Sequence, residues 1–372
     1  MAWKPKTFLS LLGHVTIQRG YYLCRDCGSG YFPYDAALGI VATHLTPGAT
    51  EVICLAGVNQ SFSQASKVAL VKMCGLHVSE STVQRTTETT GEKLGEMLAA
   101  KQTIGEEKPW EWERDAQGRT CAYVSVDATG VRQQGEHAKK AEGKMAYVGM
   151  IYNPRGASET KQRKPERIER KRRYLAGFYP LDELGLQLRR QAAQVGWDNA
   201  KQQIALSDGG SGLEEFFRKN FPLAEHILDF WHANEYLVEL GPTLFGEGSA
   251  EAKAWCEEQG HRLKHEGGAA VLAKLEQLDV SDRSESIREA WRCVTTYFRN
   301  HQHKMDYPRY VANGWQIGSG QVESACNTVV NDRLSGAGKR WGSPGSDAVC
   351  HLRALYLSEP AQWEQFWHPL AL

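Results

Sequence analysis

The sequence lacks a long hydrophobic run, a signal peptide, internal repeats and low-complexity segments. No stretch approaches about 18 uninterrupted apolar residues, the length that a membrane-spanning helix needs. Residues 1–6 do not have the basic, apolar and small-residue order of a signal peptide. We therefore expect a soluble, cytoplasmic protein that has no membrane partner.

Charge of one sign is not in excess either. The 44 Lys and Arg residues balance 44 Asp and Glu residues, so the net charge is zero. This balance excludes a uniformly basic, histone-like DNA-binding protein. Residues 161–173 depart from it, with eight basic and two acidic side chains. Such a run is either a solvated surface segment or a patch that follows a phosphate backbone, and the sequence leaves both open.

The nine cysteines are odd in number and scattered along the chain, which is typical of reduced thiols and excludes a disulfide framework. Cys24 and Cys27 form a C-x-x-C pair, which is half of the ligand set of a zinc ribbon. Residues 1–23 contain no second pair, and His14 is the one further candidate ligand there. We expect the two thiols to lie together on a turn and to bind no zinc.

The composition is otherwise that of a globular protein, with 41% hydrophobic and 24% charged residues among 372. This length allows two or three domains of about 150 residues. Hydrophobic periods and polar boundaries predict a β-ribbon over residues 1–35 and a helical domain over 36–105. An α/β core is expected over 106–243 and 313–372, interrupted by a helical insertion over 244–312.

Within residues 62–99, two predicted helices meet at a turn that contains Gly75. Ser81 and Gln84 have the spacing of a capping box at the start of the second helix. The outline is that of a helix-turn-helix, although any antiparallel helical hairpin produces the same pattern. Polar residues begin the second helix, and among them we expect Arg85 to contact DNA.

From residue 106 onward, the pattern becomes α/β. Strands are predicted over residues 121–126, 145–151, 174–178, 203–207 and 225–228, with helices over 181–194, 212–219 and 233–240. Three strands, a helix, a strand and a helix follow one another in the order of a ribonuclease-H-like core. A further helix, over residues 347–357, is expected to pack on this sheet.

Three carboxylates stand out in this core. Asp127 and Asp208 follow apolar strands, and in an open α/β sheet the carboxyl ends of the strands are where ligand sites form. Glu323 follows a Gly-Ser-Gly loop, in the first turn of a predicted helix. Singly, each Asp is explained as a turn or capping residue, and the Glu as a solvated side chain. Together, three converging carboxylates suit Mg²⁺ or Mn²⁺, and two such ions clamp a phosphodiester for in-line displacement.

Short motifs recur in a specific order over nearly the whole chain. They are Tyr21–Pro33, Val78–Val83, Val126–Gly130, Leu206–Gly210, Asp229–His232, Gly318–Ser324, Arg340–Trp341 and Leu352–Ser358, followed by Trp363 and Phe366–Trp367. In these motifs the chain resembles the bacterial insertion-sequence DDE transposases of the ISKra type, which are related to the Mutator-like transposases of eukaryotes. The resemblance implies a ribonuclease-H-like core whose DDE triad is Asp127, Asp208 and Glu323, with two Mg²⁺ or Mn²⁺ ions as cofactors.

The resemblance also implies roles for residues around the triad. Asp229 and His232 correspond to the family's D-x-x-H signature, although a helix-capping Asp with a packed His explains the pair equally well. Lys339 and Arg340 have the character of a DNA-backbone contact, and Trp341 that of a ring that stacks on a distorted base. A surface basic pair beside a core Trp is the alternative interpretation.

These observations leave competing functions. The first is a DDE transposase that cleaves and joins DNA, with the terminal inverted repeats and target DNA as partners. Such an enzyme would be associated with the nucleoid and would form a homo-oligomer when assembled on DNA. The alternative is a non-catalytic DNA-binding protein derived from a transposase, which the missing half of the zinc ribbon favours. A stand-alone nuclease is the third.

Overall fold

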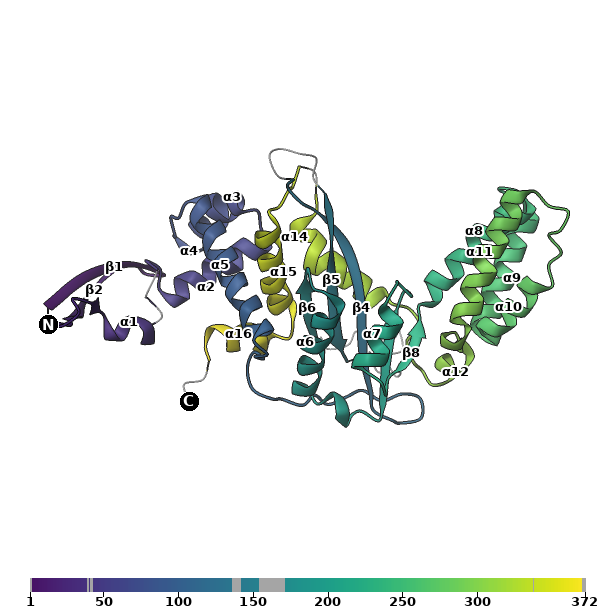
Figure 1. The fold of residues 1–372 in the computed structure, drawn as a ribbon, viewed down its shortest axis with the longest axis horizontal. Helices are drawn as coiled ribbons and strands as arrows, with labels where there is room; N and C mark the ends of the chain where they lie inside the picture. The colour runs from purple at the N-terminus through teal and green to yellow at the C-terminus, as the bar shows by residue number, and fades with distance from the viewer. Residues whose placement is uncertain are drawn as a thin grey trace. The chain divides into compact units, whose positions relative to one another are not determined.

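The structure is a computed structural model that describes residues 2–38, 40, 43–135, 142–153, 171–336 and 338–369. Contacts divide the chain into two units (Figure 1). The first unit consists of Met1–Gly105, Gly130–Lys144 and Val329–Leu372, and the second of Glu106–Thr129 and Met145–Thr328. The division after Gly105 falls where the sequence predicts a boundary. Residues 161–170 of the predicted basic run lie outside the described residues.

The first unit begins with an antiparallel ribbon. Strand β1 (Ala2–Ser10) pairs along its whole length with β2 (Gly13–Leu23), which also pairs with the short β3 (Gly30–Tyr31). The predicted β-ribbon is confirmed, and its first strand, β1, contains Pro5, which lowers strand propensity. The strand tolerates Pro5 because β1 is an edge strand of the sheet. Helix α1 (Pro33–Ala37) follows the ribbon.

The C-x-x-C pair lies on the turn between β2 and β3, as predicted. The Gly28 N–H donates to the Cys24 carbonyl, and the Cys24 N–H donates to the Ser29 carbonyl. Both thiols are free and exposed. Hydrogen bonds to Ser29 and to Cys24 lower the pKa of the Cys27 thiol to about 7.

We predict that protein washed with EDTA carries no stoichiometric zinc, because two thiolates are half of a structural zinc ligand set. Elemental analysis by mass spectrometry checks this. One zinc per chain that disappears in a Cys24→Ser variant would contradict the prediction.

Helices form the rest of the first unit. Helix α2 (Pro47–Asn59) is followed by α3 (Phe62–Gln64), which continues through a π-helical segment (Ala65–Ala69) into α4 (Leu70–Cys74). The chain turns at Gly75, whose φ of 65° is left-handed, and enters α5 (Glu80–Ala99). The predicted helical hairpin is confirmed. Its second helix is capped by Ser79, which accepts a hydrogen bond from the Thr82 N–H at 3.1 Å, and not by Ser81.

The C-terminal helices α15 (Ser343–Leu357) and α16 (Pro360–Trp367) also belong to the first unit. Helix α15 packs mainly against α5 and also against α2. The prediction that it packs on the sheet was therefore wrong about its main partner. The approach to α5 is close: a Cβ atom at Gly91 would lie 2.1 Å from the Ala348 carbonyl oxygen. The predicted last segment, 313–372, is therefore divided between the two units at Thr328.

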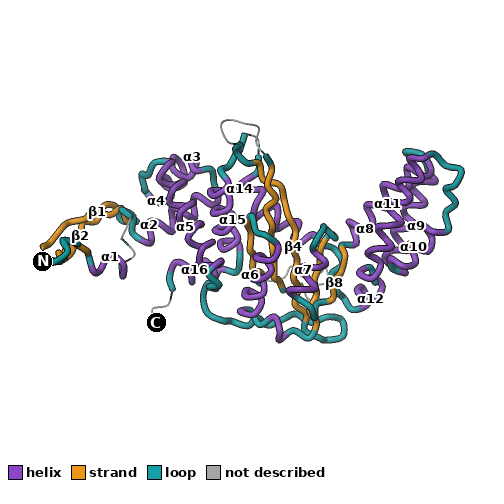
Figure 2. Tube along the Cα trace, in the orientation of Figure 1, coloured by secondary structure: helices purple, strands orange, loops and turns teal. Residues whose placement is uncertain are grey.

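A five-stranded mixed sheet forms the centre of the second unit (Figure 2). Its strands are β4 (Cys121–Arg132), β5 (Gly143–Tyr152), β6 (Arg172–Gly177), β7 (Gln202–Ser207) and β8 (Glu225–Leu228). They lie in the order β6-β5-β4-β7-β8. Strand β7 is parallel to both β4 and β8, whereas β5 and β6 are antiparallel. Helix α6 (Leu181–Gln194) packs against β6 and against α7 (Leu213–Asn220). The fold is therefore mixed α/β, as predicted.

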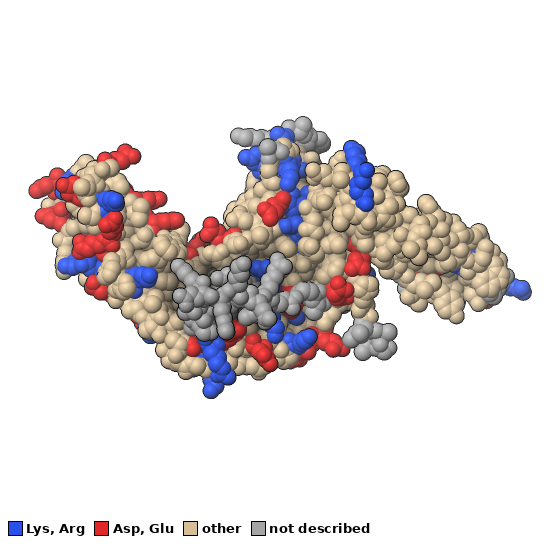
Figure 3. Space-filling view, turned by 180° about the vertical axis from the view of Figure 1, so that it is seen from behind, with Lys and Arg blue, Asp and Glu red and all other residues tan. Residues whose placement is uncertain are grey.

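Residues 230–312 of the second unit form a block of helices. These are α8 (Phe230–Phe245), α9 (Ala250–Glu266), α10 (Gly268–Glu276), α11 (Glu285–His301) and α12 (Tyr307–Ala312). The surface of this block mixes acidic and basic side chains (Figure 3), with ion pairs such as Arg292–Glu289 and Arg299–Glu276. In the part of the chain that the structure describes, every helix is too short or too polar to traverse a membrane.

Candidate active site

Asp127 and Asp208 lie near the same end of two neighbouring parallel strands. Strands β4 and β7 are paired up to Ser125 and Leu206. Asp127 comes two residues after this last pair, and Asp208 directly follows the end of β7. The register therefore places both carboxylates at the carboxyl end of the parallel pair, where ligand sites form in α/β sheets.

Asp127 is not a turn or capping residue, because β4 continues beyond it to Arg132. Its Oδ1 accepts a hydrogen bond from the Ala128 N–H at 2.7 Å, and its Oδ2 accepts one from the Cys326 thiol at 3.4 Å. Burial raises the pKa of Asp127, and the negative charges of Asp208 and Glu323 raise it further. Asp208 and Glu323 therefore each lie within electrostatic reach of Asp127.

Asp208 is half-buried and shapes its own turn. Its Oδ1 accepts a hydrogen bond from the Gly210 N–H at 2.9 Å, across Gly209, whose φ is 85°. This Asx turn is the structural role that the sequence left open for Asp208. The turn occupies one carboxylate oxygen with one hydrogen bond, so the carboxylate retains lone pairs for a ligand.

Glu323 is exposed on the short helix α13 (Gly320–Ala325). This helix continues into a π-helical segment (Cys326–Asn331), and such segments are frequent at functional sites. Cys326 follows Glu323 by three residues, so the two side chains share a face of the helix. Because the Cys326 thiol contacts Asp127, that face of α13 is the one directed toward the strand carboxylates.

The sequence interpretation missed Cys326. Burial, and then the negative charge of Asp127, raise the pKa of its thiol, so the thiol keeps its proton and remains a donor. The spacing of three residues from Glu323 is the signal that could have indicated its position. A lone cysteine in the sequence, however, gives no sign of what it contacts.

Asp229 links three segments of the site. Its Oδ1 caps α8, accepting hydrogen bonds from the N–H groups of Trp231 at 2.6 Å and His232 at 3.1 Å. Its Oδ2 accepts hydrogen bonds from both the N–H and the hydroxyl of Ser319. The Asp229 N–H in turn donates to the Ser207 carbonyl at 2.8 Å. Asp229 therefore connects two parts of the site. One is the end of β7, next to Asp208, and the other is Ser319, directly before the helix α13 that carries Glu323.

The helix-capping interpretation of Asp229 is thus confirmed. Asp229 is buried at 5% exposure, whereas the His232 ring is partly exposed. The His232 Nδ1 lies 3.5 Å from an Oε2 oxygen of Glu235, and its ring lies edge-on to Tyr236. His232 therefore contributes its backbone N–H to the junction, and its ring contacts other residues of the helical block.

The donor set is suited to a hard cation. Carboxylate oxygens are the ligands that Mg²⁺ and Mn²⁺ prefer, and a cation would relieve the repulsion at Asp127. Among the described residues, however, no three His, Cys, Asp or Glu side chains are gathered closely enough to hold a metal ion. The chemistry of the three carboxylates fits the metal, but their side chains have to move closer together to share one.

The predicted DNA-binding residues lie in the first unit. Arg85 and Arg340 are exposed, whereas the Lys339 Nζ donates to the Arg333 carbonyl at 3.1 Å. Trp341 is buried at 8% exposure, and its indole N–H donates to the Leu334 carbonyl at 3.0 Å. The structure thus places this ring in the core, which favours the structural interpretation of Trp341 and gives a base no face to stack on.

A protein-family profile matches residues 2–367, which is nearly the whole chain. The chain belongs to the uncharacterised protein family UPF0236. No curated protein matches it in sequence. The match includes the ribbon, the helical hairpin, the sheet and the helical block. It assigns no chemistry, so the function is inferred from the site itself.

Proposed function

We propose that this UPF0236 protein is a DDE transposase that performs metal-dependent cleavage and strand transfer of insertion-sequence DNA. The observation that carries the proposal is the hydrogen bond from the Cys326 thiol to Asp127, because it places the helix of Glu323 beside the paired strands that carry Asp127 and Asp208. These residues come from a strand, a strand end and a helix that are far apart in the sequence. The negative charges of Asp208 and Glu323 disfavour the charged form of Asp127 in the absence of a cation, which is the arrangement expected of a metal-binding catalytic site.

A ribonuclease-H-like core is part of the proposal. What supports it is the strand order, in which the first strand, β4, lies between the second and the fourth. The first, fourth and fifth strands run parallel, and the helical block separates β8 from α13. In this arrangement the first and fourth strands bring two Asp residues together, and the returning helix brings the Glu.

Two Mg²⁺ or Mn²⁺ ions, when bound, would activate the attacking oxygen and stabilise the leaving oxygen of the phosphodiester. Asp127, Asp208 and Glu323 would hold them. The chain's other residues orient these ligands. The Cys326 thiol fixes one oxygen of Asp127, and Asp229 holds the start of α13 against the end of β7.

The proposed DNA partners are the terminal inverted repeats of the element and its target, bound by a homo-oligomer. Helix α5 supports this because Arg85 is exposed near its start, and the one hydrogen bond of its guanidinium within the described residues goes to the Ser81 carbonyl of its own helix. An exposed Arg near the start of the second helix is where a helix-turn-helix contacts DNA.

Arg85→Ala is expected to weaken binding to duplex DNA. Each lost phosphate contact lowers the dependence of log K on log salt concentration by about 0.9. Fluorescence anisotropy at several salt concentrations measures this slope. Lys253→Ala, which removes an exposed cation from α9, serves as the control. If the affinity and the salt slope of the variant equal those of the wild type, Arg85 does not contact DNA and the hairpin has only a packing role.

Incubation of purified protein with its flanking DNA and Mg²⁺ tests the proposal. We expect strand breaks at the element ends that leave 3′-hydroxyl groups, and EDTA should prevent them. The second candidate, a non-catalytic DNA-binding protein, is favoured by the absence of a preformed metal cluster among the described residues. It predicts binding to the same ends without any breaks in Mg²⁺ or Mn²⁺.

A further inference from the structure

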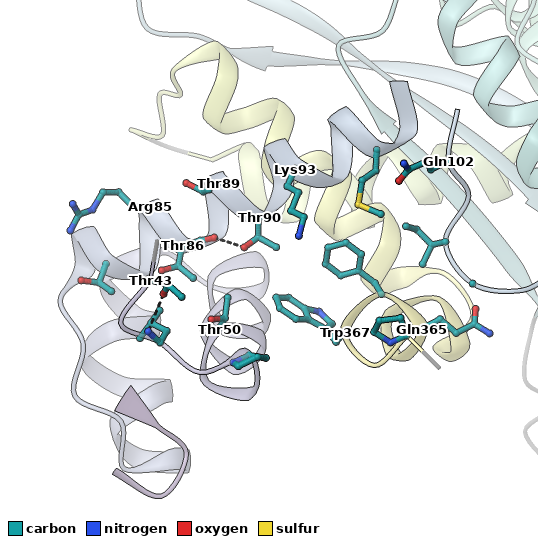
Figure 4. A pocket seen from close by; sticks show the side chains of 18 of the residues that line it. Thr43, Thr50, Arg85, Thr86, Thr89, Thr90, Lys93, Gln102, Gln365 and Trp367 are labelled. Carbon is teal, nitrogen blue, oxygen red and sulfur yellow. Dashed lines mark hydrogen bonds between the residues drawn. The ribbon is translucent and has the colours of Figure 1, made fainter. Parts of the chain in front are cut away.

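The first unit contains a cavity of about 1100 Å³ that the proposed reaction does not use (Figure 4). One wall is the face of α5, a second is the segment Thr43–Thr50, and a third is the C-terminal segment around α16. The volume slightly exceeds the range of small-ligand sites, roughly 300–1,000 Å³. The cavity therefore has room for more than one nucleotide-sized group.

Helix α5 turns a single polar face to this cavity. Its lining residues recur at intervals of one, three and four positions: Thr82, Arg85, Thr86, Thr89, Thr90, Lys93 and Met97. The opposite face, which includes Val83, Leu94 and Leu98, is buried. The Thr82 and Thr90 hydroxyls bond within the first unit, to Ser79 and to the Thr86 carbonyl. The cationic groups of this face and the Thr86 and Thr89 hydroxyls are directed to the cavity instead of the core.

The lining is positively charged. Arg85 and Lys93 line the cavity, and no Asp or Glu does. The acidic residues Glu88, Glu92 and Glu96 of α5 lie on a different stripe of the helix. Lys93 is exposed, and its ammonium group has no hydrogen-bond or ion-pair partner among the described residues. This segregation of charge along one helix favours an anionic ligand.

Aromatic rings face the cations. Phe366 and Trp367 of α16 line the cavity, and both are partly exposed. Figure 4 shows the Lys93 side chain extending from α5 toward the space beside the Trp367 ring, while Arg85 points outward at the rim. Thr86 and Thr89 add hydroxyl groups that have no side-chain partner among the described residues. Cations, hydroxyls and partly exposed rings together are the groups that bind a nucleic-acid strand with unstacked bases.

We propose that this cavity binds an unpaired segment of DNA, with a phosphate on Lys93 and a base stacked on Trp367. The identity of the polymer as DNA rests on the proposed function. An unpaired strand fits better than a duplex, because in a duplex both faces of each base are covered by neighbouring bases. The site would hold the single strand that is exposed when the end of an element is opened.

Binding of a fluorescent dT12 oligonucleotide to the full chain, measured by anisotropy without Mg²⁺, tests this inference. Trp367→Ala should weaken binding roughly 5- to 150-fold, because stacking is worth about 1–3 kcal/mol per base. Trp367→Phe should restore much of the affinity. Lys93→Ala should lower the salt slope by about 0.7. Trp3→Ala, which removes an exposed ring from β1, and Lys253→Ala should bind as the wild type does.

Thermal unfolding of each variant shows that a loss of binding is not a loss of folding, and Lys93→Gln provides a second, milder variant. The inference is overturned if Trp367→Ala and both Lys93 variants bind dT12 as the wild type does, or if the protein binds no dT12. Tighter binding of an RNA oligonucleotide of the same length would overturn it as well. The dT12 assay measures binding and no cleavage, so the two proposals can fail separately. If the protein binds dT12 but makes no strand breaks in the flanking-DNA assay, the binding site is supported and the transposase proposal is rejected.

Discussion

Asp127→Asn is expected to abolish DNA strand cleavage while leaving the protein at least as stable as the wild type. Asn retains the oxygen that accepts the hydrogen bond from the Ala128 N–H. It removes the negative charge that burial and the neighbouring Asp208 and Glu323 make unfavourable. Without that charge, the folded state loses repulsion and the proposed metal site loses a ligand.

The sign of the pH dependence follows from the raised pKa of Asp127. Between the unfolded pKa, about 3.9, and the higher folded value, the native state binds more protons than the unfolded state does. The contribution of Asp127 to stability therefore falls as the pH rises through this window. Asp127→Asn should remove that fall, so the midpoint of thermal unfolding of the variant should exceed that of the wild type most clearly above the window.

Asp208→Asn and Glu323→Gln extend the same experiment. Both should lose cleavage, since each removes a proposed ligand, and both remove a negative charge near Asp127. Asp198→Asn, an exposed residue between α6 and β7, is the control and should cleave as the wild type does. Variants that are destabilised yet still cut would show that the three carboxylates are structural.

Asp229→Ala should produce the largest loss of stability. The variant removes the cap of α8 and leaves the buried Ser319 N–H and hydroxyl without an acceptor. Loss of a cap costs about 1 kcal/mol and each of the two buried unsatisfied groups about 1–3 kcal/mol, so we expect a destabilisation of roughly 3–7 kcal/mol. Urea unfolding measures it. Ser249→Ala, which removes only the cap of α9, should cost about 1 kcal/mol.

Cleavage by the same variants tests whether Asp229 positions Glu323. At a temperature where circular dichroism shows both variants folded, Asp229→Ala should cleave far more slowly than Ser249→Ala. The reason is that Asp229 ties Ser319, directly before α13, to the strand that precedes Asp208. Equal cleavage per folded molecule would assign Asp229 a purely structural role.

The local elements of the fold were predictable where hydrophobic periods are strong. The hairpin around Gly75 and all five strands of the sheet follow from apolar runs bounded by turn residues. The bounds of β1 within the predicted ribbon were not predictable because Pro5 and two lysines interrupt its pattern, and pairing with β2 compensates for them. The packing of α15 on α5 was not predictable, because the hydrophobic period of a helix shows which of its faces is buried but not which element covers that face.

The candidate site, too, was predictable only in part from the sequence. Asp127 and Asp208 were selected because they follow apolar strands, and the pairing of β4 with β7 brings those strands together. The contacts that orient the site join residues far apart in sequence, such as Asp229 with Ser319 and Asp127 with Cys326. Side-chain hydrogen bonds of this kind depend on the tertiary fold, and a single sequence contains no signal for them.

The measurement that tests the central claim most directly is Mn²⁺ binding, followed by electron paramagnetic resonance on the full chain with bound flanking DNA. The account predicts that wild-type protein and Asp198→Asn bind Mn²⁺. It also predicts that Asp127→Asn, Asp208→Asn and Glu323→Gln each lose that binding, because the three carboxylates act as one ligand set. Mn²⁺ binding that is equal in all five proteins, or absent from the wild type, would contradict the account.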